Sequence, residues 1–248
     1  MKLFFFIIGS VMGSFLNLQV MRKTSECPIA EPFSVCDHCH KRLHFYNLIP
    51  ILSFLFQRGH SSCCNKKLSI RYPLSEVLCG FLYLIVYLVN VDFYKSIFMA
   101  VLISLLIAMS IIDFKTKDIY YSHVLGVFLL NVALSYYNYW FKEEAIYKLI
   151  LSFLLLIIGY MLSRKEYVGF GDILLILCLN LSLNFHETTI FLFLMSMIGG
   201  LTALVIYLEE RDRKMKIAFV PIIASSFIIL EIIKGMILWK DYSKYLYF

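Results

Sequence analysis

Long apolar segments separated by short polar ones make up most of this chain of 248 residues. A helix needs about 20 mostly apolar residues to cross a bilayer. On that basis we predict transmembrane helices near residues 3–20, 74–90, 95–112, 121–140, 146–162, 173–183, 188–208 and 218–238. The sixth of these segments is short, so it is either tilted, extended through Asp172, or incompletely spanning.

The composition agrees with this pattern. Hydrophobic residues make up 60% of the chain and charged residues 16%, and the mean hydropathy of +0.78 lies outside the range of soluble domains. The predicted fold class is therefore an all-α polytopic membrane protein of about eight transmembrane helices with a small cytoplasmic loop domain. We expect membrane lipid to surround its helices. The net charge of +6 comes from lysines and arginines clustered in loops. We therefore expect these charges to orient the protein in the membrane rather than to bind nucleic acid.

These loop charges predict the orientation of the chain. The apolar segment Met1–Val20 has no small-residue cleavage site, and positive charges follow rather than precede it, so we interpret it as a retained first span with its N-terminus outside. The segments that then face inward hold 16 of the 23 lysines and arginines, as the positive-inside rule requires. They are residues 21–73, 113–120, 163–172 and 209–217.

The same orientation predicts the domain organisation and the location. Residues 1–20 form the first helix, 21–73 a cytoplasmic loop domain and 74–248 a transmembrane core. We expect the protein in the inner (plasma) membrane, with its polar loops mainly on the cytoplasmic side.

Two aspartates lie at the ends of apolar segments, Asp113 after Ile111-Ile112 and Asp172 in Gly169-Phe170-Gly171-Asp172. An ionisable group at membrane depth is unfavourable and usually marks function. Structural roles are the alternative: Asp172 caps a helix that starts at Ile173, and Asp113 pairs with Lys117. The predicted topology brings both aspartates to the cytoplasmic ends of their helices.

The 21–73 loop contains a possible metal site. Cys36 and Cys39 form a Cys-x-x-Cys pair, and Cys63 and Cys64 follow. In the reducing cytoplasm such thiols are expected to bind metal rather than to form disulfides, and four of them suit tetrahedral zinc. Because adjacent cysteines are expected to point apart, the fourth ligand beside Cys64 stays open between His60 and Cys63. Unligated thiols are the alternative.

Two further acids have open assignments. Glu76, just inside the second predicted span, either pairs with Arg71 or lines a site. Glu231 and Lys234 have the spacing of an ion pair within one helix.

Several of these motifs, in this order, resemble the type IV prepilin peptidases, a family of GxGD intramembrane aspartyl proteases. The resemblance covers most of the chain. Its motifs are Gly13-Ser14-Phe15-Leu16-Asn17, the loop from Cys36 through Ile49-Pro50, Ser53, Gly59 and Cys64 to Arg71-Tyr72-Pro73, Glu76 and Gly80, Asp113 with Ile119, Gly169-Phe170-Gly171-Asp172, and Ala218-Phe219-Val220-Pro221. The chain departs from the family pattern at Ser61, where a cysteine is usual, at Tyr120, where a proline is usual, and at Leu174, where a lysine is frequent.

The resemblance implies a reaction, ligands and partners. Asp113 and Asp172 would be the catalytic pair. Independently of the family, Gly169 and Gly171 lack side chains and are expected to leave room for an extended substrate backbone to approach Asp172. The substrate would be a prepilin or pseudopilin whose leader is cleaved at the cytoplasmic face. Many family members also methylate the new N-terminus with S-adenosylmethionine, and their loop domain binds structural zinc.

Two other function classes account for part of the pattern. Paired acids in a membrane protein also serve ion- or proton-coupled transporters, although transporters are expected to distribute acids through the membrane and to contain a repeat. A non-catalytic membrane scaffold would need the cysteine loop but neither aspartate.

Overall fold

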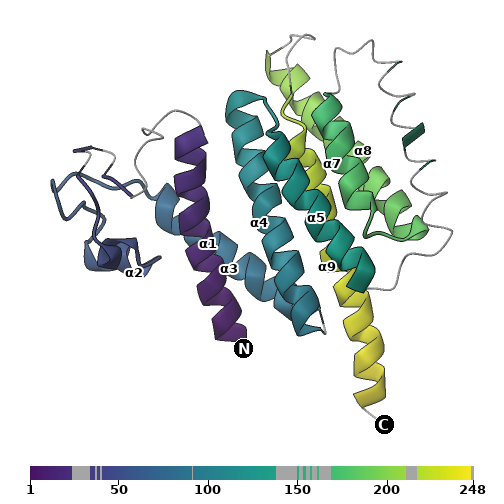
Figure 1. Cartoon of the computed structure of the whole chain (residues 1–248), viewed down its shortest axis with the longest axis horizontal. Helices are drawn as coiled ribbons and strands as arrows, with labels where there is room; N and C mark the ends of the chain where they lie inside the picture. The colour runs from purple at the N-terminus through teal and green to yellow at the C-terminus, as the bar shows by residue number, and fades with distance from the viewer. Residues whose placement is uncertain are drawn as a thin grey trace. The chain divides into compact units, whose positions relative to one another are not determined.

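The computed structural model of the chain divides into two compact units, Met1–Ala100 and Val101–Phe248 (Figure 1). It describes residues 1–23, 34–36, 38–39, 41–90, 92–137, 150, 153–154, 157, 161, 169–210 and 217–246. The domain boundaries predicted at residues 20 and 73 stay a prediction.

The first unit contains two long helices that pack on each other, α1 (Lys2–Lys23) and α3 (Arg71–Val89) (Figure 1). Glycines allow their backbones to approach closely, as small residues commonly do in membranes. A Cβ atom at Gly9 would lie 2.6 Å from the carbonyl oxygen of Cys79, and one at Gly13 would lie 2.9 Å from the Cα of Glu76. Between α1 and α3 in the sequence lie the short helices η1 (Phe45–Leu48) and α2 (Leu52–Phe56).

The second unit is a helical bundle. Helix α4 (Phe93–Thr116) enters it from the first unit, and the other helices are α5 (Tyr121–Tyr137), α7 (Phe170–Asn180), α8 (Phe185–Glu210) and α9 (Val220–Leu246). Helix α7 packs against α5 and α9, and α8 packs against α9 (Figure 1). The most deeply buried apolar side chains of this core include Leu102, Leu106, Val127, Leu175, Leu179, Ile223 and Phe227.

Helix length and hydropathy confirm the predicted all-α membrane protein. Among the described residues, four helices are long and apolar enough to cross a bilayer: Arg71–Val89, Phe93–Thr116, Phe185–Glu209 and Val220–Ile237. Shorter apolar helices cover Lys2–Leu18, Tyr121–Ser135 and Phe170–Asn180. Helix α8 buries little of its apolar surface against the described residues, as a helix surrounded by lipid does. The span predicted at 146–162 lies largely outside the described residues.

Helix α7 begins at Phe170 rather than at Ile173, so it extends through Asp172. That outcome is one of the three alternatives left open for the short sixth segment. At 11 residues it remains short.

The expected ion pair within α9 is confirmed, and it has a third member. The Nζ atom of Lys234 lies 2.8 Å from Glu231 Oε1 and 3.0 Å from Glu187 Oε1, which belongs to the first turn of α8. The other oxygen of Glu187 accepts the backbone N–H of Asn184 at 2.8 Å. One lysine therefore joins the start of α8 to the side of α9.

Candidate functional site

Asp113 lies in the last turn of α4, where the helix stops. Its carbonyl oxygen accepts the N–H of Lys117 at 2.8 Å, and Lys117 ends the helix in a left-handed conformation with φ +57°. The side chain of Asp113 is 5% exposed. Its Oδ2 atom accepts the backbone N–H of Val220, the first residue of α9, at 3.0 Å. One carboxylate thus joins the end of α4 to the beginning of α9.

Asp172 lies in the first turn of α7 and is 8% exposed. Its Oδ2 atom accepts the backbone N–H of Gly169, the residue that precedes the helix, at 3.1 Å. Asp172 therefore does cap the helix, as predicted. It does so as the third residue of the helix, and it accepts one backbone N–H. A helix start that was expected at Ile173 lies three residues earlier.

The two carboxylates lie close enough to interact electrostatically. Each accepts a backbone N–H at the start of a helix, where the aligned peptide dipoles favour negative charge. In both, the bond goes to Oδ2. Both aspartates that the sequence singled out are therefore buried at helix ends of the same unit. Buried carboxylates that interact can act as an acid and a base.

The glycines beside Asp172 leave space for two different neighbours. A Cβ atom at Gly169 would lie 3.0 Å from Oδ2 of Asp172 itself. A Cβ atom at Gly171 would lie 3.0 Å from Cδ1 and 3.1 Å from Cβ of Ile119, in the connection between α4 and α5. The absence of a side chain at Gly169 therefore leaves space for the Asp172 carboxylate. The absence of one at Gly171 lets the α4–α5 connection pack on α7.

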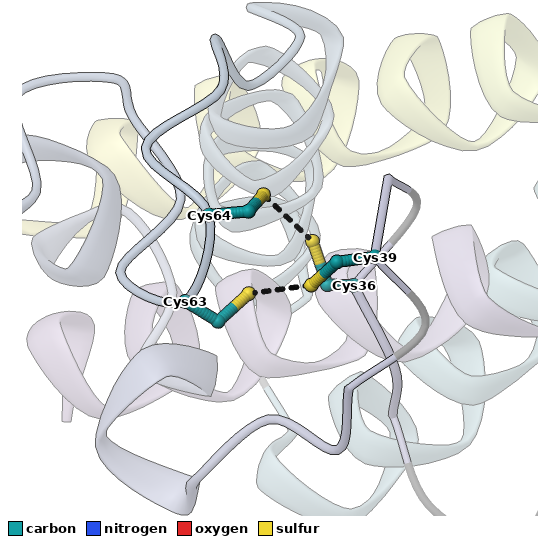
Figure 2. Close-up of side chains that lie close together, drawn as sticks. All are labelled: Cys36, Cys39, Cys63 and Cys64. Atoms are coloured by element: carbon teal, nitrogen blue, oxygen red, sulfur yellow. Dashed lines mark hydrogen bonds between the residues drawn. The ribbon is translucent and has the colours of Figure 1, made fainter.

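The four cysteines predicted as metal ligands converge from two turns of the first unit (Figure 2). One turn, closed by the bond from Cys36 N–H to the carbonyl of Lys41 at 2.9 Å, carries Cys36 and Cys39. The other carries Cys63 and Cys64. The sulfur atoms of Cys36 and Cys64 lie 3.8 Å apart, those of Cys39 and Cys63 lie 3.1 Å apart, and all four lie within 4.8 Å of one another.

This geometry fits a tetrahedral metal ion. Bonds of about 2.3 Å to zinc hold thiolate sulfurs about 3.8 Å apart. The expectation that Cys63 and Cys64 point apart was wrong, because both sulfurs join the cluster. His60 is not part of it, and its Nδ1 lies 2.9 Å from the carbonyl oxygen of Arg58.

Ser61 lies within the same cluster. Its hydroxyl oxygen is 3.3 Å from the sulfur of Cys36 and 3.1 Å from that of Cys63. Ser61, which occupies the position where the family usually has a cysteine, thus contacts two of the thiols through a hydroxyl group. The adjacent pair Cys63-Cys64 brings the set to four.

Hydrogen bonding lowers the pKa of one of the thiols and so favours the thiolate form that binds a cation. Burial raises the pKa of Cys36, but hydrogen bonds from Ser61 and from the backbone of His38 and Cys39 lower it by more, to about 6. A backbone hydrogen bond with Lys41 lowers the pKa of Cys39, but the neighbouring thiols outweigh it and raise that pKa to about 11. Negative charge therefore collects first on Cys36, and the thiolate is the form that binds metal.

Comparison with known proteins gives the family. The model of the bacterial peptidase A24 N-terminal domain matches residues 7–90, and the model of the type IV leader peptidase family matches residues 100–204. A prepilin leader peptidase/N-methyltransferase of Klebsiella pneumoniae is 30% identical, over 71% of this chain and 82% of the relative. The chain belongs to the type IV leader peptidase family.

Other relatives support this membership. Proteins named prepilin leader peptidase/N-methyltransferase match from Dickeya chrysanthemi, at 28% identity over 89% of this chain and 88% of the relative, and from Pseudomonas putida, at 27% over 83% and 81%. No solved structure gives a significant match.

Two contacts in this leader peptidase family member were not foreseen from the sequence. The Phe219-Val220-Pro221 segment resembled a family motif, but the sequence assigned it no role, whereas Val220 donates to Asp113. Ile119 was noted for its place before Tyr120, whereas its side chain packs where Gly171 lacks one. The Phe219-Val220-Pro221 segment thus contacts Asp113, and Ile119 packs on the residue that precedes Asp172.

Proposed function

We propose that this protein is an intramembrane aspartyl endopeptidase that removes the leader peptide of type IV prepilins or pseudopilins. The main support is the pair of buried carboxylates, Asp113 and Asp172, which lie at helix ends and interact electrostatically in a chain of the leader peptidase family. Relatives named as prepilin leader peptidases support the substrate class. Family membership favours this function over a transporter or a scaffold.

The two carboxylates have complementary roles in peptide hydrolysis. Two close, poorly solvated carboxylates share one proton, so one is a base and the other an acid. The ionised aspartate takes a proton from water, the water oxygen bonds to the peptide carbon, and the other aspartate gives its proton to the departing amide nitrogen. Leader and mature chain then separate as a carboxylic acid and an amine.

The second proposed activity is methylation of the amine that cleavage releases. It rests on the relatives, which are named as N-methyltransferases. With S-adenosylmethionine as co-substrate, the nitrogen lone pair forms the new N–CH₃ bond while the S–CH₃ bond breaks. The bonding pair stays on sulfur as a thioether, and the amine proton leaves to solvent.

Zinc bound by Cys36, Cys39, Cys63 and Cys64 would supply structure rather than chemistry. Four protein thiolates fill the coordination sphere of the ion and leave no position for water or substrate. The two turns that carry the thiols contain few buried apolar side chains, so the metal would be their main cross-link.

Cleavage is proposed at the cytoplasmic face of the inner membrane. This orientation rests on the 16 of 23 lysines and arginines in the segments predicted to face inward. Membrane vesicles of known sidedness test the function and the orientation together. A soluble prepilin peptide that spans the leader and the cleavage site is added with and without S-adenosylmethionine, and the products are weighed by mass spectrometry.

We expect inside-out vesicles to cleave the peptide and right-side-out vesicles to leave it intact. The mature product should gain the mass of one methyl group only when S-adenosylmethionine is present. Cleavage confined to right-side-out vesicles would show that the site faces the outside, opposite to the proposed orientation. No cleavage in either preparation, with the protein present, would refute the peptidase.

The Gly169→Ala variant tests whether the position of the Asp172 carboxylate matters. Alanine fits the backbone here, at φ −75° and ψ 147°, but its Cβ would lie 3.0 Å from Oδ2 of Asp172. We expect cleavage to fall roughly tenfold to a hundredfold, as small misplacements of a reacting group do. Thermal unfolding should hardly change.

Gly200→Ala is the matched control. Nothing lies within 4 Å of a Cβ atom at this position of α8. The variant should cleave at the normal rate and be stabilised by up to about 1 kcal/mol, the helix preference of alanine over glycine. Equal activity of the two variants would contradict a positional role for Gly169.

A further inference from the structure

A cavity of about 140 Å³ lies within the first unit, where α1 and α3 meet the cysteine turns and α2. Its lining combines apolar side chains with several hydrogen-bonding groups. Glu76 is the one carboxylate among the described residues that line it, and these include no lysine, arginine or histidine.

Glu76 is 7% exposed, although it carries a carboxylate. Its Oε2 atom accepts the backbone N–H of Ile51 at 2.7 Å. In the described part of the chain, neither Arg71 nor any other basic side chain forms an ion pair with it. A buried ionised carboxylate is strongly unfavourable unless a positive group compensates it, and without one the group binds a proton. This burial therefore points to a cationic ligand.

The backbone that Glu76 contacts is strained. Ile51 has φ +63° and ψ −52°, and the N–H of Leu52 bonds to the carbonyl of Pro50 at 2.6 Å, which closes a three-residue turn around Ile51. A β-branched residue rarely adopts this conformation. Such strain persists only where the surroundings enforce it, and it concentrates at ligand sites. Here the enforcing group is the carboxylate that faces the cavity.

A second hydrogen-bonding side chain of the cavity is Asn17 of α1, which contacts the residue before Glu76. The side-chain nitrogen of Asn17 donates to the hydroxyl of Ser75 at 2.7 Å. Because that bond uses the nitrogen, the acceptor of this side chain is its amide oxygen. An ammonium group has three N–H donors and no acceptor, so it matches a carboxylate beside an amide oxygen.

The size of the cavity selects a small ligand. A cavity of about 150 Å³ holds a benzene-sized molecule. Leu48, Phe54 and Leu68 provide apolar contacts for one side chain of that size. A whole nucleoside derivative such as S-adenosylmethionine is several times larger.

We propose that this cavity binds the free α-ammonium group and first apolar side chain of a peptide, with Glu76 as the counter-ion. In the cell that peptide would be the new N-terminus released by leader cleavage, so the proposal rests on the methylating function proposed above. The cavity would hold the methyl acceptor, while Asp113 and Asp172 carry out cleavage. Binding of the amine can nonetheless be measured without either reaction.

The test uses the purified full-length protein in detergent with phenylalaninamide as the probe. Calorimetric titration should detect its binding, and N-acetyl-phenylalaninamide, which has no charge, should bind at least tenfold more weakly. Glu76→Gln keeps an oxygen for the Ile51 N–H and removes the charge, so it should weaken phenylalaninamide binding at least tenfold. Prepilin cleavage by this variant should stay within twofold of normal, while methylation falls at least tenfold.

Two further variants separate charge and space from folding. Glu209→Gln removes a charge from an exposed position on α8 and should change nothing. Ser53→Leu leaves Glu76 intact and fills the cavity from α2, so it should also abolish binding of phenylalaninamide. Should the Glu76→Gln protein fail to accumulate, this variant decides alone.

Three results would overturn the proposal. One is unchanged phenylalaninamide binding after Glu76→Gln or Ser53→Leu. Another is binding of S-adenosylmethionine, rather than the amine, that depends on Glu76, which would assign the cavity to the methyl donor. The third is equal binding of the acetylated and free amides. If instead the normal protein binds phenylalaninamide but never cleaves prepilin, the peptidase proposal fails and the amine site stands.

Discussion

Proteins carrying Asp113→Asn or Asp172→Asn are expected to accumulate in the membrane normally and to lose leader cleavage. Asparagine keeps an oxygen that can accept the N–H of Val220 or Gly169, so the helix ends stay capped. It removes the group that exchanges a proton. A positioned acid or base contributes roughly a hundredfold to ten-thousandfold to a rate, and each single variant should lose at least that much.

The double variant distinguishes a catalytic pair from two independent residues. Residues that act as a unit are not additive, so the double change should be hardly worse than either single one. Asp118→Asn is the matched control, since Asp118 is exposed and lies five residues from Asp113. It should cleave normally. Full cleavage by either single variant would exclude the proposed dyad and leave the two aspartates as helix caps.

Loss of Cys63 is expected to release the metal, and a cysteine at position 61 is expected to restore it. The Cys63→Ser protein should bind less than about a tenth of an equivalent of zinc, because structural zinc sites need all their thiolates. The hydroxyl of Ser61 is 3.3 Å from the sulfur of Cys36 and 3.1 Å from that of Cys63. A sulfur in its place would therefore reach the same ion, and the Ser61→Cys/Cys63→Ser protein should bind about one equivalent.

Zinc content and limited proteolysis of the loop measure this effect. The Cys63→Ser loop should be cut rapidly by added protease, whereas the double variant should resist it. Cys178→Ala, a change of a cysteine in α7, should leave both measurements unchanged. A Cys63→Ser protein with a full equivalent of zinc would show that the cluster binds metal without its fourth thiol.

Hydropathy predicted the helices well because lipid selects long apolar segments, and α3, α4, α8 and α9 lie where that signal is strong. Local spacing also predicted the ion pair of Glu231 and Lys234. Both signals come from residues that are neighbours in the sequence.

Contacts between distant segments leave no such signal. The bond from Val220 to Asp113 joins residues 107 positions apart, and Glu187 reaches Lys234 from another helix. The adjacent thiols of Cys63 and Cys64 face the same point because the chain turns sharply, with Asn65 at φ +54° and Ser61 N–H bonded to the carbonyl of Lys66. Backbone angles of that kind are set by the fold, and the residue types alone do not encode them.

The shortness of α7 affects how related chains are recognised. Its 11 residues rise only roughly 16 Å, about half the thickness of the hydrocarbon layer. A survey that counts spans by length and hydropathy passes over this helix, although it carries one of the two aspartates. In distant homologues, such a survey would likewise leave out the equivalent helix. The Gly-x-Gly-Asp motif at the start of the helix is the more dependable marker for aligning them.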